Sequence, residues 1–173
     1  VEAGRLPEAL APLQAAVQGL PNHARAHDFL GRVLFAARRP DEALAQFQRA
    51  AALDAGDELL HFDLGKVLSD LGRPLEAVKA FQQALIVNPD YGMAYMGLGV
   101  AFVQQRNLPD AIAALQRAVT LLPDSAEAEN GLAVALAQAG RTQEALEHVK
   151  RALVLNPDYA AARDNLARLT RGK

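Results

Sequence analysis

The amino-acid sequence predicts an all-α fold, a right-handed α-solenoid of helix-turn-helix repeats that are 34 residues long. Small residues recur at that period, at Gly31, Gly65, Gly99 and Ala133. Alanines form two further columns, at Ala43, Ala77, Ala111 and Ala145 and at Ala50, Ala84, Ala118 and Ala152. The string NPDY occurs twice, at residues 88–91 and 156–159, which is two periods apart. Neither helix of a copy can bury its apolar stripe alone, so stacked copies are needed to form a continuous core.

The repeat divides the whole chain. Four full copies cover residues 24–57, 58–91, 92–125 and 126–159. Residues 1–23 fit the second helix of a truncated copy, in which Pro12 is expected to break or kink the helix. Residues 160–173 are predicted to form a C-terminal capping helix with a polar outer side. We therefore expect a single array over residues 1–173, excised from a longer protein with more copies or another domain upstream.

Breaker residues indicate where the helices start. Proline can occupy the first turn of the second helix without losing a hydrogen bond, at Pro40, Pro74 and Pro109. Acids follow and complement the helix dipole, at Glu42, Glu76, Asp110 and Glu144. Short acceptor side chains are expected to cap the first helices, at Asn22, Asp57, Asp90, Asp124 and Asp158.

The three glycines in register need a packing reason, because glycine inside a helix costs about 1 kcal/mol relative to alanine. Without a Cβ atom, the first helix of a copy can approach its second helix closely. We expect the close approach at the alanine column that starts with Ala43.

This pattern resembles the tetratricopeptide repeat (TPR) family over essentially the whole chain. The third copy carries the family motif most fully, at Tyr95, Leu98, Gly99, Phe102, Ala111, Leu115, Ala118 and Pro123. Two departures are local. The large-aromatic column holds His27, His61, Tyr95 and Glu129, and Ala55 replaces proline in the first copy. The resemblance implies a superhelix with a concave groove lined by the first helices.

The resemblance and the helical spacing together predict a peptide-binding site in this groove. The predicted site residues are Arg25, Asp28, Arg32, Leu59, Phe62, Lys66, Met93, Met96, Val100, Val103, Asn130 and Val134. Phe35, Ser69, Glu127 and Ala137 share the same face.

The predicted site has an apolar middle and a basic shoulder. The segment GMAYMGLGVAFV at residues 92–103 is apolar all round and holds both methionines of the chain. Arg25, Arg32 and Lys66 would add positive charge toward the N-terminal end. We expect a protein or peptide partner that is apolar or amphipathic with an acidic end.

The function predicted is that of a noncatalytic protein–protein interaction scaffold. The alternative is a self-assembly module that forms dimers or higher oligomers through the truncated N-terminal stacking face or the groove. Three other readings of the apolar segment stay open: a central core helix, a self-association surface and a groove filled by upstream helices. The carboxylate clamp of chaperone-binding TPR domains is absent, since its positions hold Asp28, Arg32, Asp63, Met93 and Gly97.

Composition gives no sign of an enzyme or of other ligand classes. The chain has no cysteine, and its net charge of -2 lacks the basic excess of nucleic-acid binders. No apolar run is long enough to span a bilayer. His23, His27 and His61 are expected to be core or rim histidines rather than metal ligands, so no cofactor or metal is predicted. We expect a soluble protein, with the cytoplasm favoured and the periplasm left open because the natural N-terminus is expected to lie upstream.

Overall fold

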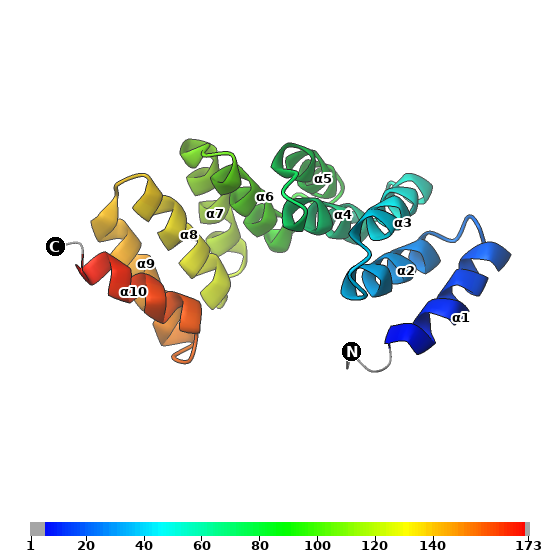
Figure 1. The fold of residues 1–173 in the computed structure, drawn as a ribbon. Helices are drawn as coiled ribbons and strands as arrows, with labels where there is room; N and C mark the ends of the chain where they lie inside the picture. The colour runs from blue at the N-terminus through cyan, green and yellow to red at the C-terminus, as the bar shows by residue number, and fades with distance from the viewer. Residues whose placement is uncertain (1–5, 172–173) are drawn as a thin grey trace. The chain divides into compact units, whose positions relative to one another are not determined.

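The computed structural model describes residues 6–171, which form ten α-helices and no strand (Figure 1). The all-α fold class is therefore confirmed. The helices are α1 (Leu6–Gly19), α2 (Ala24–Ala36), α3 (Pro40–Leu53), α4 (Glu58–Asp70), α5 (Pro74–Val87), α6 (Gly92–Gln104), α7 (Leu108–Leu121), α8 (Ala126–Gln138), α9 (Thr142–Leu155) and α10 (Ala160–Arg171).

The chain divides into two compact units. The N-terminal unit is Val1–Asn88 and the C-terminal unit is Pro89–Lys173. In the N-terminal unit α2 packs on α3 and α4 on α5, while α1 lies against α2 and α3 against α4. In the C-terminal unit α6 packs on α7 and α8 on α9, while α7 contacts α8 and α9 contacts α10. That residues 1–173 form one array stays a prediction.

The glycine column lies where the two helices of a copy meet. A Cβ atom on Gly65 would come within 2.6 Å of the Phe81 ring, and one on Gly99 within 2.4 Å of Leu115. The fourth copy carries Ala133 in this column, and there the residue in the ring position is the smaller Val149, which is fully buried. The two helices of a copy therefore approach closely at the glycines, but the contact is with the column of Phe47, Phe81 and Leu115 and not with the alanine column that starts with Ala43, where it was expected. The space available depends on the size of the side chain that the glycine faces.

The turn between the two helices of each full copy has a fixed backbone shape. One residue per copy adopts a positive φ, at Arg38 (61°), Gly72 (70°), Arg106 (59°) and Gly140 (78°). This column repeats every 34 residues, and it holds glycine in two copies and arginine in two. Glycine adopts this conformation without the steric cost that a Cβ atom adds.

The second helices begin with a side-chain ion pair as well as a favourable dipole. The N-cap residues Arg39, Arg73 and Arg141 each hold the acid three residues later with two hydrogen bonds, at distances of 2.6–2.7 Å. In the third full copy the neutral Asn107 takes the place of the arginine and donates one hydrogen bond to Asp110 at 2.7 Å. The helix dipole favours an acid at this position, and in three copies the contact with the arginine stabilises it further.

The predicted caps of the first helices were mostly wrong. Asp57 does cap α4, accepting from the Leu59 N–H at 3.0 Å. The caps of α2, α6 and α8 are instead His23, Tyr91 and Ser125, each one residue after the predicted acceptor. The Pro-Asp pair of NPDY forms the turn itself, so the aspartate lies too early to act as the cap.

The first helix also differs from its prediction. Pro12 lies inside α1, yet α1 continues from Leu6 to Gly19. A proline removes one backbone donor from a helix, and here the exposed position of Pro12 leaves its ring on the outer side. The expected break at Pro12 therefore does not occur.

Candidate functional site

The basic shoulder predicted for the N-terminal unit is neutralised by acids of the same unit. Arg25 forms an ion pair with Asp57 at 2.6 Å. Arg32 joins two carboxylates, since its Nε lies 3.0 Å from Asp28 Oδ2 and its second terminal nitrogen donates to Asp63. Only Lys66 of the three predicted cations makes no ion pair within residues 6–171. These pairs could not be read from the sequence, because Asp57 and Asp63 lie about 30 residues along the chain from Arg25 and Arg32, at the start of α4 and within it.

Asp28 is the most constrained charge of this network. Its side chain is 1% exposed, and neither of its carboxylate oxygens accepts a hydrogen bond within the described chain. Burial raises the pKa of Asp28 to about 6, and nearby Asp63 and Asp57 act in the same direction, while Arg32 and Arg25 oppose the shift. Asp28 was predicted to face the groove, but it has almost no surface to offer a ligand.

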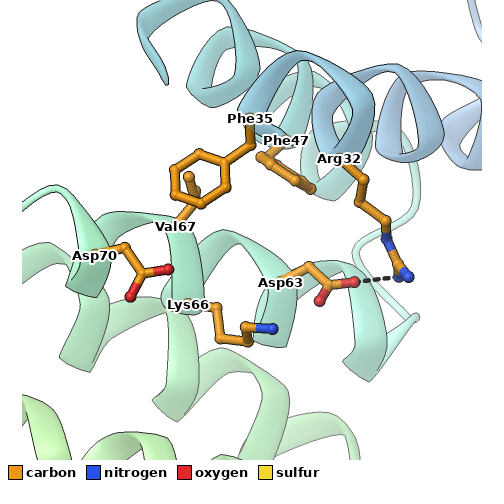
Figure 2. Close-up of a pocket in the computed structure, with 7 residues that line it drawn as sticks. All are labelled: Arg32, Phe35, Phe47, Asp63, Lys66, Val67 and Asp70. Atoms are coloured by element: carbon orange, nitrogen blue, oxygen red, sulfur yellow. Dashed lines mark hydrogen bonds and ion pairs between the residues drawn. The ribbon is translucent and has the colours of Figure 1, made fainter. Parts of the chain in front are cut away.

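A pocket of about 170 Å³ lies beside this network, between α2 and α4 (Figure 2). Phe35, Phe47 and Val67 provide its apolar side, and Arg32, Asp63, Lys66 and Asp70 provide charges of both signs. Figure 2 shows Phe35 and Val67 among the residues that line the pocket, with Asp63 joined to Arg32 by a dashed line. The pocket can accept an apolar group, and its charges do not favour one sign.

The other two predicted residues of the N-terminal unit differ in accessibility. Leu59 is 37% exposed on α4. Phe62 is half-buried and packs against Phe81, with ring centroids 5.9 Å apart. Phe62 therefore supports the core of its copy as well as the surface.

The apolar helix α6 of the C-terminal unit has two kinds of side chain. Met93 and Val100 lie two turns apart and are 38% and 43% exposed. Met96 and Val103 are partly buried and pack against a core cluster that includes Leu115 and Leu132. The helix contains no charged residue. The core interpretation therefore applies to Met96 and Val103, which pack inside the unit, while Met93 and Val100 are exposed to solvent.

Polar groups gather between α8 and α10 in the same unit. Asn130 and Asn165 are 7% and 8% exposed, and Asn165 Nδ2 donates to Asn130 Oδ1 at 2.8 Å. Arg168 donates to Asn165 Oδ1. These residues line a pocket of about 710 Å³ together with Val134, Ala161, Asp164, Ala167 and Arg171.

Of the residues that line this pocket, only Asn130 and Val134 belong to the site predicted from the sequence. Asn165, Arg168 and Arg171 lie on α10, which was interpreted as a cap with a polar outer side. The repeat itself held the signal, because Arg168 falls in the column of Arg32, Lys66, Val100 and Val134. The groove columns, continued into α10, therefore include Arg168.

The histidines serve the packing of helix pairs. His27 Nδ1 lies 2.7 Å from Gln46 Oε1, and His148 Nδ1 lies 2.6 Å from Glu129 Oε2. In both pairs the residues are 19 apart, so they occupy the same two columns of the repeat. The other two copies place an aromatic ring in the first column, His61 or Tyr95, and a buried alanine in the second. Across residues 6–171 no three His, Cys, Asp or Glu side chains are grouped so that they could hold a metal ion.

Comparison with known proteins places the chain in a family. The family model for the tetratricopeptide repeat matches residues 1–58, 62–126 and 101–160. The chain belongs to the tetratricopeptide repeat family. No curated protein sequence matches the chain. None of the TPR helices described is long and apolar enough to cross a membrane.

Solved structures show the same TPR fold. MamA is 22% identical, with a TM-score of 0.81 over 91% of this chain and 92% of that one. YrrB, described as a TPR protein with an unusual peptide-binding site, is 25% identical, with a TM-score of 0.77 over 93% of this chain and 83% of that one. A chain of the APC/C hetero-tetramer Cut9–Hcn1 is 22% identical, with a TM-score of 0.83 over 96% of this chain and 33% of that one.

Proposed function

We propose that this TPR chain is a noncatalytic scaffold that binds a peptide or partner segment along the first-helix faces of its copies. The observation that carries the proposal is the open apolar surface of α6, where Met93 and Val100 stand exposed on a helix without charge. A surface helix normally places polar residues on its wet side. The peptide-binding site named for YrrB supports the same function class.

The chemistry of the partner follows from these surfaces. An apolar side chain of the partner would cover Met93 and Val100, and methionine adapts its shape to varied partners. The pocket beside Phe35 would take a second apolar group in the N-terminal unit. Because Arg25 and Arg32 already pair with carboxylates, we no longer propose that they attract an acidic end of the partner.

A selection for peptides tests the proposal. Dodecapeptides selected from a random phage-displayed library against the whole chain are synthesised with a fluorescein label. Their binding is then measured by fluorescence anisotropy against the wild type and the Met93→Glu, Val100→Glu double variant. We expect the variant to bind at least about tenfold more weakly, because a buried charge without a partner opposes docking. Both residues are exposed, so the fold should tolerate the change.

The matched control is Val154→Glu. Val154 is 81% exposed on α9, a second helix, and the substitution adds a similar charge to an apolar surface position. Peptide binding should not change in this variant. Equal affinities for the wild type and the α6 double variant would reject the proposed surface.

Self-assembly is the competing function. Multi-angle light scattering over a hundredfold range of concentration separates the two. A monomer that binds the selected peptides supports the scaffold. A mass that rises with concentration and falls in the Met93→Glu, Val100→Glu variant would assign the same apolar surface to assembly.

A further inference from the structure

We infer that the pocket between α8 and α10 is a carboxylate-binding site, which receives an acidic group of the bound partner segment. The inference rests on the proposed function and gives the partner a specific anchor. Its donors are the amide of Asn130 and the guanidinium groups of Arg168 and Arg171, all of which line the pocket. The acidic end predicted from the sequence is thereby assigned to a different unit from the one first expected.

Hydrogen-bond donors and acceptors determine the orientation of the two amides. A guanidinium group can only donate, so Asn165 must turn its Oδ1 toward Arg168. Asn165 then presents Nδ2 to Asn130, which must accept with Oδ1 at 2.8 Å. The Nδ2 group of Asn130 is left as a donor without a partner in residues 6–171. Asn130 as a whole is only 7% exposed, so its side chain is held in place, while its Nδ2 group is not among the fully buried unpaired atoms and can be reached from the pocket that Asn130 lines.

The charge of the pocket matches a single carboxylate. Arg168 and Arg171 are positive and Asp164 is the one acid of the lining, which leaves a net charge of +1. Neither arginine forms an ion pair with an acid in the described part of the chain. Hydrogen bonds to an ionised carboxylate are stronger than those between neutral groups. The pocket in the N-terminal unit lacks this property, because Arg32 is already bound to Asp28 and Asp63.

An apolar recess adjoins the donors. A second pocket of about 280 Å³ shares Val134, Asn165 and Arg168 with the first and adds Ala133, Ala137 and Leu169. A segment with an aliphatic side chain next to its carboxylate could therefore fill both pockets. The carboxylate could belong to an Asp or Glu side chain or to a C-terminus, since both present the same two oxygens.

The first experiment uses acetate, which is the carboxylate alone. Acetate is titrated into the ¹⁵N-labelled whole chain at pH 7, and the side-chain amide signals of Asn130 and Asn165 are followed by NMR. We expect saturable shifts that acetamide, the neutral analogue, does not produce. Arg168→Gln should weaken acetate binding about tenfold, since it removes one charge-assisted donor. Equal shifts with acetate and acetamide would overturn the inference.

Arg163→Gln is the matched control. Arg163 lies on the same helix and carries the same charge, but it pairs with Asp158 at 2.6 Å and does not line the pocket. Acetate binding should be unchanged in this variant. A loss equal to that in Arg168→Gln would show general attraction to positive charge and would reject a built site. Both arginines are exposed, and thermal melts verify that the variants remain folded.

The second experiment identifies the source of the carboxylate. Three fluorescein-labelled peptides are compared: Gly-Ser-Leu-Asp-Leu-Ala-Ser as a C-terminal amide, the same peptide with Asn for Asp, and the Asn peptide with a free C-terminus. We expect the first or the third to bind about tenfold more tightly than the Asn amide, and only to chains that retain Arg168. Equal affinities for all three would overturn the inference but leave the apolar surface of α6 in place. Acetate binding without any peptide binding would instead support the site and count against the scaffold.

Discussion

The two units place different residues in the same pair of columns. In the N-terminal unit the pair is Asp28 on α2 and Asp63 on α4, and in the C-terminal unit it is Asn130 on α8 and Asn165 on α10. Each pair is 35 residues apart and bridges neighbouring first helices. The carboxylates need Arg32 between them and leave Asp28 without a hydrogen bond. The amides bond directly to each other.

This difference shows that the same backbone positions of the repeat can form different polar networks, depending on which side chains occupy them. Two carboxylates can only accept hydrogen bonds and repel each other, and in the N-terminal unit the half-exposed Arg32 forms ion pairs with both. An amide can donate and accept at once, so two amides satisfy each other and keep a donor to spare. In the N-terminal unit, Arg25 and Arg32 therefore form ion pairs with acids of the same unit. In the C-terminal unit, Arg168 and Arg171 line a pocket.

The largest effect is expected from substitutions that prevent the close approach of two helices at a glycine, a feature that both units share. Gly65→Leu and Gly99→Leu should each lower the free energy of unfolding by about 3 kcal/mol, because the new side chain meets Phe81 or Leu115 in a closed interior. Urea unfolding followed by circular dichroism measures the change.

Gly31→Ala serves as the mild control within the N-terminal unit. Its Cβ atom would lie 3.2 Å from the Phe47 ring, a contact that a small shift relieves. The gain in helix propensity of about 1 kcal/mol should offset the strain, so the stability should stay within about 1 kcal/mol of the wild type. Unfolding curves for Gly65→Leu that match those of the wild type would contradict the packing argument.

The next effect tests the contrast between carboxylate and amide directly. Asp28→Asn should stabilise the N-terminal unit by about 2 kcal/mol at pH 7, since it removes a buried charge. The pKa of Asp28 in the folded protein is about 6, above its ordinary value of 3.8. The native state therefore binds more protons between these values, and the free energy of unfolding of the wild type falls as the pH rises through this window.

The pH profile gives the control for this prediction. The advantage of Asp28→Asn should be absent near pH 2.8, about a unit below the ordinary pKa, where the carboxyl is protonated in both states, and complete above about pH 7. Asp63→Asn should give no such gain, because Asp63 accepts a hydrogen bond from Arg32 and is less buried. A constant difference between Asp28→Asn and the wild type at all pH values would refute the buried-charge account.

The smallest effect is expected when the Glu129–His148 pair of the C-terminal unit is replaced by the His–Gln pair found in the N-terminal unit. Glu129→His should cost about 1–2 kcal/mol in the C-terminal unit, because His148 loses its carboxylate partner at 2.6 Å. Adding His148→Gln recreates the His27–Gln46 pair of the N-terminal unit and should recover at least half of the loss. Strictly additive effects of the two changes in thermal melts would show that the columns do not act as a pair.

Much of the fold could be predicted because its signals are local and repeated. Helix positions followed from breakers such as Pro40 and Pro74, and the close approach at Gly65 followed from a glycine where a helix prefers alanine. The caps failed because the acceptor side chain had to be placed within one residue. Both Asp90 and Tyr91 precede the apolar run, and only the turn geometry decides between them.

The candidate site was harder to predict because charge pairing joins residues that lie far apart in the chain. Arg25 and Arg32 are cations in the sequence, but their partners Asp57 and Asp63 lie about 30 residues away and approach them only in the folded chain. Arg168 was overlooked because α10 was interpreted as a cap with a polar outer side, so the groove columns were not extended into it.

The sequence by itself determined the all-α class, the 34-residue period and the helix pairing, because backbone preferences and small side chains act over one or two turns of chain. The tertiary structure decided which charged side chains form ion pairs with each other and which line a pocket without an ion-pair partner. That depends on distances of a few ångströms between side chains about 30 residues apart. Burial then sets whether a carboxylate such as Asp28 or an amide such as Asn130 is stable at the same place in the repeat.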